Sequence, residues 1–254
     1  MLELKITDDV AYITFNRPEK LNTFKVKHMH ELKEMLKGLN RKKNLLFLVF
    51  QGRGKVFSAG FDISDFMPSI DRKEPFYEVF PDLLRYIRNI KCPTLAVLHG
   101  SAYGFGCGLA VSCDFRIAKK GGVLAIPISK LGFNYSPNEI LSLTHKMGIP
   151  IIKELLLAGR PLSFERAYNL GVINHLLESD QELEIEINNY IEDNRKLAPM
   201  AVKFGKKAIN HLVQNLVARE DEAYELFYEL FDTKDFVEGQ KAFLEKRKPF
   251  FRGE

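Results

Sequence analysis

Three short segments in the first half of the sequence have the pattern of buried β-strands: residues 45–51 (LLFLVFQ), 94–100 (TLAVLHG) and 114–118 (DFRIA). The first two are short and almost continuously apolar, which favours strands that are covered on both faces. Stretches with helical periodicity separate the strand patterns. Strands that alternate with helices predict an α/β fold with parallel pairing.

A hairpin and a helix are predicted before the first of these strands. Residues 2–7 (LELKIT) and 10–16 (VAYITFN) are rich in β-branched and aromatic side chains, and the pair Asp8 and Asp9 between them indicates a turn. From Val26 onward, apolar residues recur at intervals of three and four, which is typical of one face of a helix. These residues are Met29, Leu32, Leu36 and Leu39.

After about residue 180 the strand patterns stop and helical patterns take over. A tail of helices with this many phenylalanines has more apolar surface than a small bundle can bury. We therefore expect it to pack on the rest of the chain or on another subunit. One predicted stripe contains Leu197, Ala201, Phe204, Ala208 and Leu212, and a second contains Leu226, Phe227, Leu230 and Phe231.

The composition limits the classes of function. The 254 residues are 46% hydrophobic, which is enough for a substantial core, but no stretch approaches the roughly 20 apolar residues that span a bilayer. Residues 1–10 (MLELKITDDV) do not have the pattern of a secretory leader, so we expect a cytoplasmic protein with no membrane partner. The formal net charge is only +4, and basic residues are scattered among acidic ones. Nucleic-acid binding usually needs a concentrated basic face, so no nucleic-acid partner is expected.

The three cysteines indicate neither a metal site nor a disulfide framework. Cys92, Cys107 and Cys113 have no CxxC spacing and no neighbouring histidine pattern. We expect reduced thiols that are mostly buried, and no bound metal.

Two glycine-rich loops are the candidate functional segments. Residues 52–66 (GRGKVFSAGFDISDF) and 99–115 (HGSAYGFGCGLAVSCDF) each begin near the end of a predicted strand. Backbone N–H groups at a helix N-terminus have no intrahelical acceptor and can hold a developing oxyanion; alternatively, the glycines only permit tight turns and close packing. A dinucleotide-binding fingerprint is excluded, because its third glycine would fall at Leu109 and no acidic residue follows about 20 residues later.

A series of motifs along nearly the whole chain resembles those of the crotonase superfamily, the enoyl-CoA hydratases and isomerases. The resemblance implies an α/β fold built as a spiral of ββα units over residues 1–195. It implies a C-terminal helical region over residues 196–254 that forms homotrimers or hexamers and closes over coenzyme A. It also implies a lyase-type enzyme that acts on an acyl-CoA substrate, with coenzyme A as part of the substrate and no separate cofactor. The motifs are NRPEKLN (16–22), GRGKVFSAGFDI (52–63), HGSAYGFGCGLAVSCDFRIA (99–118), ELLLAGRPLSFERAYNLGVINHL (154–176) and FLEKRKPFF (243–251).

The same resemblance implies roles for individual residues. The backbone N–H groups of Phe61 and Phe105 match the oxyanion hole that polarises the thioester carbonyl. Phe243 and Lys246 match a tail that closes over coenzyme A, although simple packing and a solvated cation explain them equally well. Positions that line the coenzyme A path in the family are Lys20, Asn22, Ser58, Gly60, Asp62 and Ile63.

The sequence departs from the family at its acid and base positions. The two hydratase glutamates that bracket a water would fall at Gly108 and Ile128, and the isomerase acid would fall at Ser136. Neither glycine nor isoleucine can transfer a proton, so the known hydratase machinery is missing. A backbone oxyanion hole does not depend on these side chains.

Residues 126–176 are most similar to the methylmalonyl-CoA decarboxylases within this family, including a tyrosine, here Tyr135, three residues after a turn glycine. In those enzymes the tyrosine lies by the departing carboxylate, while their histidine and glutamate would fall here at Phe61 and Gly108. Loss of CO₂ from a malonyl-type thioester generates the enolate without a base. Tyr135 is therefore a candidate to donate a proton or orient the carboxylate; a packed ring with its hydroxyl in water is the alternative.

Glu139 is the remaining acidic candidate. Ser136, Pro137 and Glu139 have the spacing of a capping box, which predicts a structural role; a capping glutamate can still face a pocket. Three functions follow: a lyase with a decarboxylase-like pocket, an isomerase that uses Glu139 as its acid, and an acyl-CoA binding protein without catalysis. We favour the first.

Overall fold

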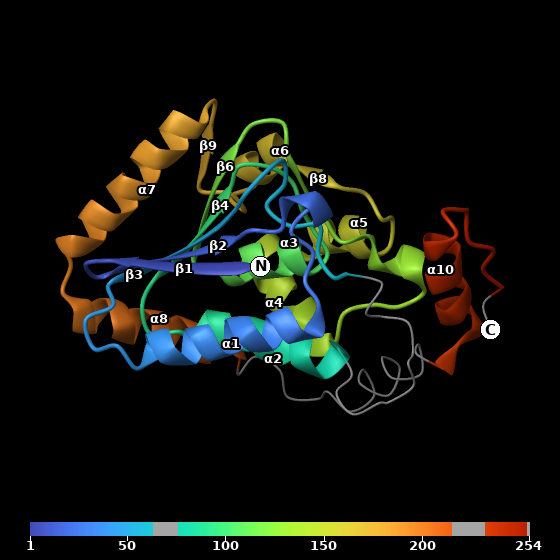
Figure 1. Ribbon diagram of the computed structural model, residues 1–254, viewed down its shortest axis with the longest axis horizontal. Coiled ribbons are helices and arrows are strands. Elements are labelled where there is room, and N and C mark those ends of the chain that lie inside the picture. The colour runs from blue at the N-terminus through green and yellow to red at the C-terminus, as the bar shows by residue number, and fades with distance from the viewer. Residues whose placement is uncertain (63–75, 215–231, 253–254) are drawn as a thin grey trace.

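Figure 1 shows the computed structural model, which describes residues 1–62, 76–214 and 232–252. Within these residues the main sheet has six strands, in the order β1-β2-β3-β4-β6-β9. The first two strands form the predicted antiparallel hairpin, and each later neighbouring pair is parallel. The predicted α/β fold with parallel pairing is confirmed. The strands are β1 (Leu2–Thr7), β2 (Val10–Phe15), β3 (Phe47–Gly52), β4 (Thr94–Leu98), β6 (Phe115–Lys119) and β9 (His175–Leu177).

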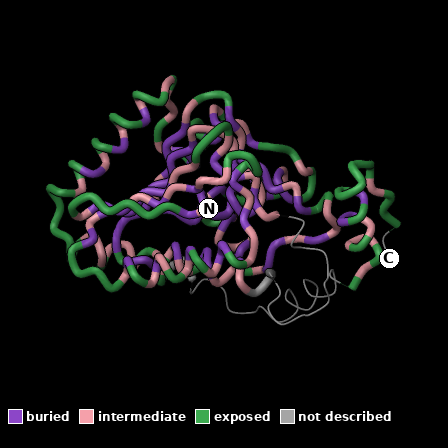
Figure 2. The backbone as a smooth tube through the Cα atoms, in the orientation of Figure 1, coloured by how far each residue is buried: buried purple, intermediate pink, exposed green. Residues whose placement is uncertain are grey.

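Helices cover both faces of this sheet, as Figure 1 shows. One face packs on α1 (Val26–Asn40), α2 (Phe76–Asn89) and α3 (Phe105–Ser112), and the other packs on α7 (Asp180–Arg195). Alternate residues of a strand point to opposite faces, so Leu48 of β3 joins the first core and Val49 joins the second. The inner strands β2, β3, β4 and β6 are mostly buried, whereas β1 at the edge of the sheet is exposed after its first residue (Figure 2). The predicted helix from Val26 is confirmed as α1.

A second, smaller sheet lies beside α3. Its strands are too short to have a sequence periodicity and were not predicted from the sequence. The strand β7 pairs in parallel with β5 and antiparallel with β8. The strands are β5 (Ala102–Tyr103), β7 (Val123–Ala125) and β8 (Leu162–Ser163).

Short helices complete the region around the site. They are η1 (Pro18–Lys20), η3 (Pro127–Leu131), α4 (Pro137–Met147), α5 (Ile149–Leu156) and α6 (Phe164–Asn169). The helix α4 begins where predicted, with Ser136 at the N-cap and Pro137 in the first turn. The predicted capping box is wrong, because the Ser136 side chain accepts no capping hydrogen bond and the Glu139 carboxylate binds Arg88 instead.

The C-terminal region contains α8 (Pro199–Gln214) and α10 (Lys234–Leu244). The helix α8 packs against α2 and α4, and α10 packs against η3. The second predicted helical stripe, residues 226–231, lies outside the described residues. Within the described part of the chain, no helix is long and apolar enough to cross a membrane. The three cysteines are free and buried, as expected.

Candidate active site

A cavity of about 870 Å³ lies between η1, the N-terminus of α3, η3 and the C-terminal end of α10. Its inner wall is apolar and largely aromatic. The wall includes Met29, Phe80, Ile128, Leu131 and Phe133. Several residues singled out from the sequence also line it, namely Lys20, Phe61, Asp62, Phe105, Tyr135, Phe243 and Lys246. The fold thus brings together residues that are more than 200 positions apart in the chain.

The two glycine-rich loops meet at this cavity. Gly60 has a φ of +93°, and a Cβ atom there would lie 2.7 Å from the Tyr103 carbonyl oxygen and 3.2 Å from the Phe105 nitrogen. Only glycine allows this approach. A parallel bridge pairs Phe61 with Phe24: the Phe24 N–H donates to the Gly60 oxygen (2.8 Å), and the Asp62 N–H donates to the Phe24 oxygen (2.7 Å). In such a bridge the N–H of the middle residue, Phe61, points away from Phe24.

The first turn of α3 faces the same space. Phe105 is its first residue, and N–H groups in the first turn of a helix have no acceptor within the helix. The N-cap is Gly104 with a φ of +48°, so no side chain caps this end. The loop that follows Gly60 and the first turn of α3 meet here, so the backbone N–H groups of Phe61 and Phe105 lie on neighbouring segments. A backbone donor does not depend on the identity of the side chain.

Asn22 and Ser58 are fully buried and hold the loop in place. The Asn22 amide donates to the carbonyl oxygens of Arg53 (2.8 Å) and Val56 (3.0 Å). The Ser58 hydroxyl donates to the Asn22 carbonyl oxygen (2.9 Å) and accepts from the Gly60 N–H (3.1 Å). Neither side chain lines the cavity, so their place along a coenzyme A path stays a prediction. The other residue predicted for this path, at position 63, lies outside the described residues.

Tyr135 is buried, with only 5% of its surface exposed. Its ring packs on Phe80 with a centroid separation of 4.9 Å, and its hydroxyl has no hydrogen-bond partner among the described residues. A Cβ atom at Gly108 would lie 3.5 Å from this hydroxyl. The hydroxyl therefore lies beside the position expected to carry a glutamate in hydratases, and it does not reach solvent. Burial raises the pKa of Tyr135 well above its usual value, so the phenol stays protonated.

Glu139 is buried but does not line the cavity. Both of its carboxylate oxygens accept hydrogen bonds from the Arg88 guanidinium, at 3.0 and 3.1 Å. Burial raises the pKa of the Glu139 carboxyl, and the Arg88 charge opposes this change. This two-point contact is the geometry of a structural ion pair.

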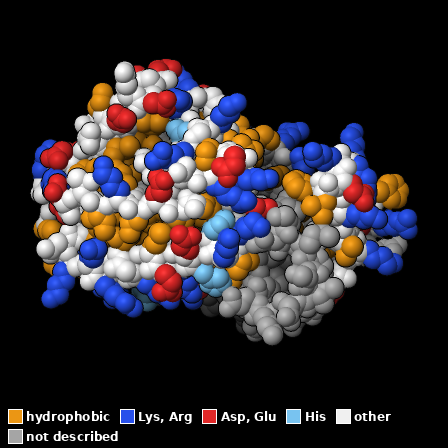
Figure 3. Space-filling model, viewed as in Figure 1, with side chains coloured by type: hydrophobic (Ala, Val, Ile, Leu, Met, Phe, Trp, Pro, Cys, Tyr) orange, Lys and Arg blue, Asp and Glu red, His pale blue; other side chains and the backbone are white. Residues whose placement is uncertain are grey.

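The cavity lining contains four cationic side chains and two acidic ones, so its formal charge is net positive. The cations are Lys20, Lys130, Lys246 and Arg247, and Figure 3 shows Lys and Arg side chains gathered at the α10 end of the molecule. Arg247 is paired with Glu238 at 2.6 Å, whereas the three lysines have no ion-pair partner in the described part of the chain. Lys130 was not predicted from the sequence, although its position two residues before the turn glycine, Gly132, in the segment that contains Tyr135 was an available signal.

Sequence comparison identifies the family. The family model described as Enoyl-CoA hydratase/isomerase matches residues 5–254. The chain belongs to the enoyl-CoA hydratase/isomerase family. As a member of this family it is an acyl-CoA enzyme with the crotonase fold, as the sequence motifs predicted.

Relatives and solved structures in the enoyl-CoA hydratase/isomerase family agree over nearly the full chain. A methylmalonyl-CoA decarboxylase of Escherichia coli (strain K12) is 30% identical over 251 residues, covering 96% of this chain and 95% of the relative. A short-chain-enoyl-CoA hydratase of Clostridium acetobutylicum is 32% identical over 248 residues, covering 94% and 92%. A crystal structure of methylmalonyl CoA decarboxylase complexed with 2S-carboxypropyl CoA has a TM-score of 0.90 at 29% identity, covering 100% of this chain and 98% of that one.

Proposed function

We propose that this enzyme decarboxylates a 2-carboxyacyl-CoA thioester of the methylmalonyl type. The observation that carries the proposal is Tyr135, whose side chain lines an apolar cavity and whose buried hydroxyl lies beside Gly108 with no hydrogen-bond partner among the described residues. The positions of the two hydratase glutamates hold Gly108 and Ile128, so neither supplies a proton-transfer group. The similarity to a methylmalonyl-CoA decarboxylase, both in sequence and in structure, supports the same choice.

The proposed reaction needs an oxyanion hole and no base. The thioester carbonyl oxygen accepts hydrogen bonds from the N–H groups of Phe61 and Phe105. The bond between the α-carbon and the carboxylate breaks, its electron pair enters the enolate, and CO₂ leaves. A proton from solvent then bonds to the α-carbon and gives the acyl-CoA. The apolar wall favours this step because a charged carboxylate becomes neutral CO₂ as charge moves towards the oxyanion hole.

Tyr135 orients the leaving carboxylate in this scheme. Its raised pKa keeps the phenol in the donor form at neutral pH, so it can donate a hydrogen bond to a carboxylate oxygen. That bond would hold the breaking carbon–carbon bond perpendicular to the thioester plane, where its electron pair overlaps the carbonyl. The same high pKa argues against Tyr135 as the proton donor, because tyrosinate would be costly at this site.

The lysines at the mouth fit the phosphates of coenzyme A. Lys20, Lys130 and Lys246 have no carboxylate partner in the described part of the chain, and all three are exposed residues that line the cavity. Ammonium groups bind phosphates by charge-assisted hydrogen bonds. Phe243 lies at the same entrance, where it can cover the bound pantetheine chain.

An isomerase that uses Glu139 is less well supported. Its carboxylate is held by Arg88 and lies away from the cavity lining. A general acid or base must come within hydrogen-bond reach of the substrate proton. Glu139 would have to break a buried ion pair to do so.

The proposal is tested by mass-resolved assays of the purified protein with methylmalonyl-CoA, crotonyl-CoA and a 3-enoyl-CoA. We expect release of CO₂ from methylmalonyl-CoA and no conversion of the other two. Tyr135→Phe should lower kcat by about 10²-fold, because one positioned hydrogen bond is lost. Tyr168→Phe, at a half-exposed position on α6, is the matched control and should leave kcat unchanged. Hydration of crotonyl-CoA, or binding of all three thioesters without turnover, would refute the proposal.

We also propose that the enzyme assembles as a homotrimer or hexamer. Exposed apolar side chains on α8 support this, since Met200 and Phe204 are 76% and 74% exposed in the single chain. Large exposed apolar side chains on one helix face are typical of an oligomer interface. Sedimentation-velocity mass measurement tests this directly, and a monomer would refute it.

A further inference from the structure

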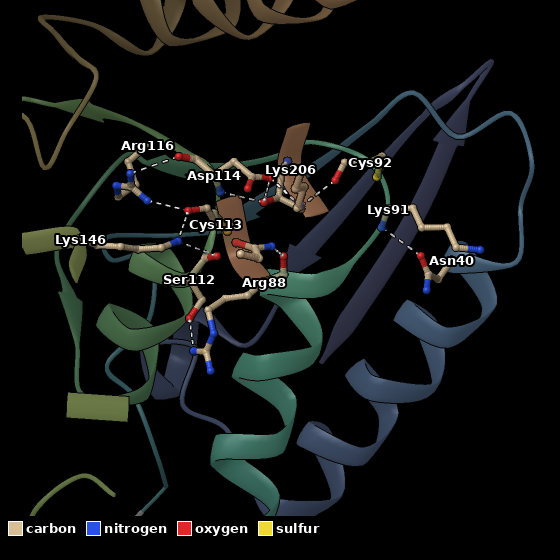
Figure 4. A network of polar contacts seen from close by, with 12 residues as sticks. Asn40, Arg88, Lys91, Cys92, Ser112, Cys113, Asp114, Arg116, Lys146 and Lys206 are labelled. Carbon is tan, nitrogen blue, oxygen red and sulfur yellow. Dashed lines mark hydrogen bonds and ion pairs between the residues drawn. The ribbon is translucent and has the colours of Figure 1, made fainter. Parts of the chain in front are cut away.

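The carboxyl end of α3 is surrounded by cations from three other elements (Figure 4). Arg116 of β6 donates to the Cys113 carbonyl oxygen at 2.8 Å. Lys146 of α4 donates to the carbonyl oxygens of Ser112 (3.2 Å) and Cys113 (3.1 Å). Arg88 of α2 donates to the Ser112 hydroxyl at 3.3 Å. The last carbonyl groups of a helix carry partial negative charge, so this end of α3 is held by charge-assisted contacts.

The opposite end of the same helix forms part of the proposed oxyanion hole. The helix contains only the eight residues from Phe105 to Ser112, and at 1.5 Å per residue its two ends are about 12 Å apart. No side chain caps its amino end, which is held by a hydrogen bond from the Gly104 N–H to the Ala125 carbonyl oxygen (2.8 Å). The charge-assisted contacts at the carboxyl end hold the other end of this short helix and so help to place the Phe105 N–H.

Lys146 differs from the two arginines because its charge is not permanent. Burial, together with the positive charges of Arg116 and Arg88, lowers the pKa of its ammonium group to about 7. Asp114 and Cys113 act in the opposite direction. Lys206 of α8, the other cation in this network, binds the Asp114 carboxylate at 2.7 Å and so reduces the acid's effect.

We propose that ionised Lys146 is a positioning residue that holds α3 in its catalytic placement, so that turnover requires the protonated ammonium group. This inference rests on the proposed function. Loss of the proton replaces two charge-assisted hydrogen bonds with weaker neutral ones and removes a cation from the helix C-terminus. The Phe105 N–H then loses its fixed distance to the thioester oxygen, while the substrate-binding lysines at the cavity mouth are untouched.

The expected pH profile follows from the chemistry. Base-free decarboxylation assigns no group of the cavity to titrate near neutrality, so kcat should be constant below about pH 6 and fall by about tenfold towards pH 9 as Lys146 loses its proton. KM should change little.

The free energy of unfolding should rise with pH over the range in which kcat falls. Between pH 7 and 9 the unfolded chain keeps the Lys146 proton and the native protein does not, so the contribution of this group to the free energy of unfolding rises with pH.

The test compares kcat and KM from about pH 6 to about pH 9 for the wild type, Lys146→Arg, Lys146→Met and Lys153→Met. Lys146→Arg should have the kcat that the wild type shows at low pH, and this kcat should not fall at high pH, because guanidinium remains charged. Lys146→Met should have, at every pH, the reduced kcat that the wild type shows near the top of this pH range. Lys153 is exposed on α5, and its variant should match the wild type. A fall in kcat that persists unchanged in Lys146→Arg and Lys146→Met would overturn the proposal.

A second readout separates this inference from the proposed reaction. Amide hydrogen exchange of α3, corrected for the intrinsic effect of pH, reports the placement of the helix without turnover. We expect protection of the hydrogen-bonded amides of α3, from Gly108 onward, to decrease above about pH 7 in the wild type and to stay constant in Lys146→Arg. Constant protection in both proteins would refute the positioning role even if methylmalonyl-CoA is decarboxylated. A pH-dependent protection without any turnover would refute the proposed reaction alone.

Discussion

Replacing Gly60 with alanine should separate the two loops that form the proposed oxyanion hole. The new Cβ atom would lie 2.7 Å from the Tyr103 carbonyl oxygen, whereas ordinary contacts begin at 3.4 Å. The loops must therefore move apart by about 0.7 Å, which is 3.4 Å minus 2.7 Å. A donor displaced this far from a distance of about 2.9 Å no longer makes a good hydrogen bond.

The backbone strain at this position can be separated from the steric effect by a matched variant. Gly121 has a φ of +88°, close to the +93° of Gly60, but a Cβ atom there would meet nothing within 4 Å. Gly121→Ala should therefore cost only the strain of a positive φ, about 1–2 kcal/mol. Gly60→Ala should lose about 1–3 kcal/mol more from overpacking.

Two measurements test this reasoning. The unfolding temperature of Gly60→Ala should lie roughly 3–9 °C below that of Gly121→Ala. Its kcat should fall by about 10²–10³-fold, as expected when one oxyanion donor is lost, while Gly121→Ala keeps the wild-type kcat. Equal kcat values for the two variants would show that the contact between Gly60 and the α3 loop does not set the geometry of catalysis.

Two further predictions concern charges around the site. Glu139→Gln keeps the shape of the side chain but leaves partly buried Arg88 without its charged partner, so the free energy of unfolding should fall by about 3 kcal/mol. A urea titration measures this loss, and an unchanged midpoint would contradict the structural role. Lys130→Met should raise KM for a CoA thioester about threefold to tenfold at low ionic strength, with kcat unchanged. The difference in KM should shrink in about 0.5 M salt, because salt screens the charge of a lysine at the open mouth of the cavity. A salt-independent difference would show that Lys130 acts by packing.

Local sequence patterns were sufficient for the main elements of the fold. The apolar segments at 45–51 and 94–100 form β3 and β4, because a continuous apolar run reflects a strand that is covered on both faces. The stripe that begins at Val26 forms α1, because its spacing reflects a helix with one buried face. The short strands β5, β7 and β8 had no such signal, since they contain too few residues for a periodicity. They form because the backbone N–H and C=O groups of β7 lie next to those of β5 and β8 once the chain has folded.

The sequence by itself also determined which side chains cannot take part in proton transfer. Gly108 and Ile128 carry no ionisable group in any conformation, and this needed no structure; their match to the hydratase glutamates stays part of the proposal. The glycines of the two loops likewise indicated a close backbone approach. Only the tertiary structure could show that Gly60 meets Tyr103 and Phe105.

The tertiary structure alone decided the roles of the polar side chains. The spacing of Ser136 and Glu139 indicated a local cap, yet Glu139 binds Arg88, which is 51 residues away in the sequence. The same packing buries the Tyr135 hydroxyl beside Gly108 and brings Lys146 to the end of α3. The physical reason is that a side chain's partner and its pKa depend on the groups that surround it after folding, and helices and strands from distant parts of the chain supply those groups.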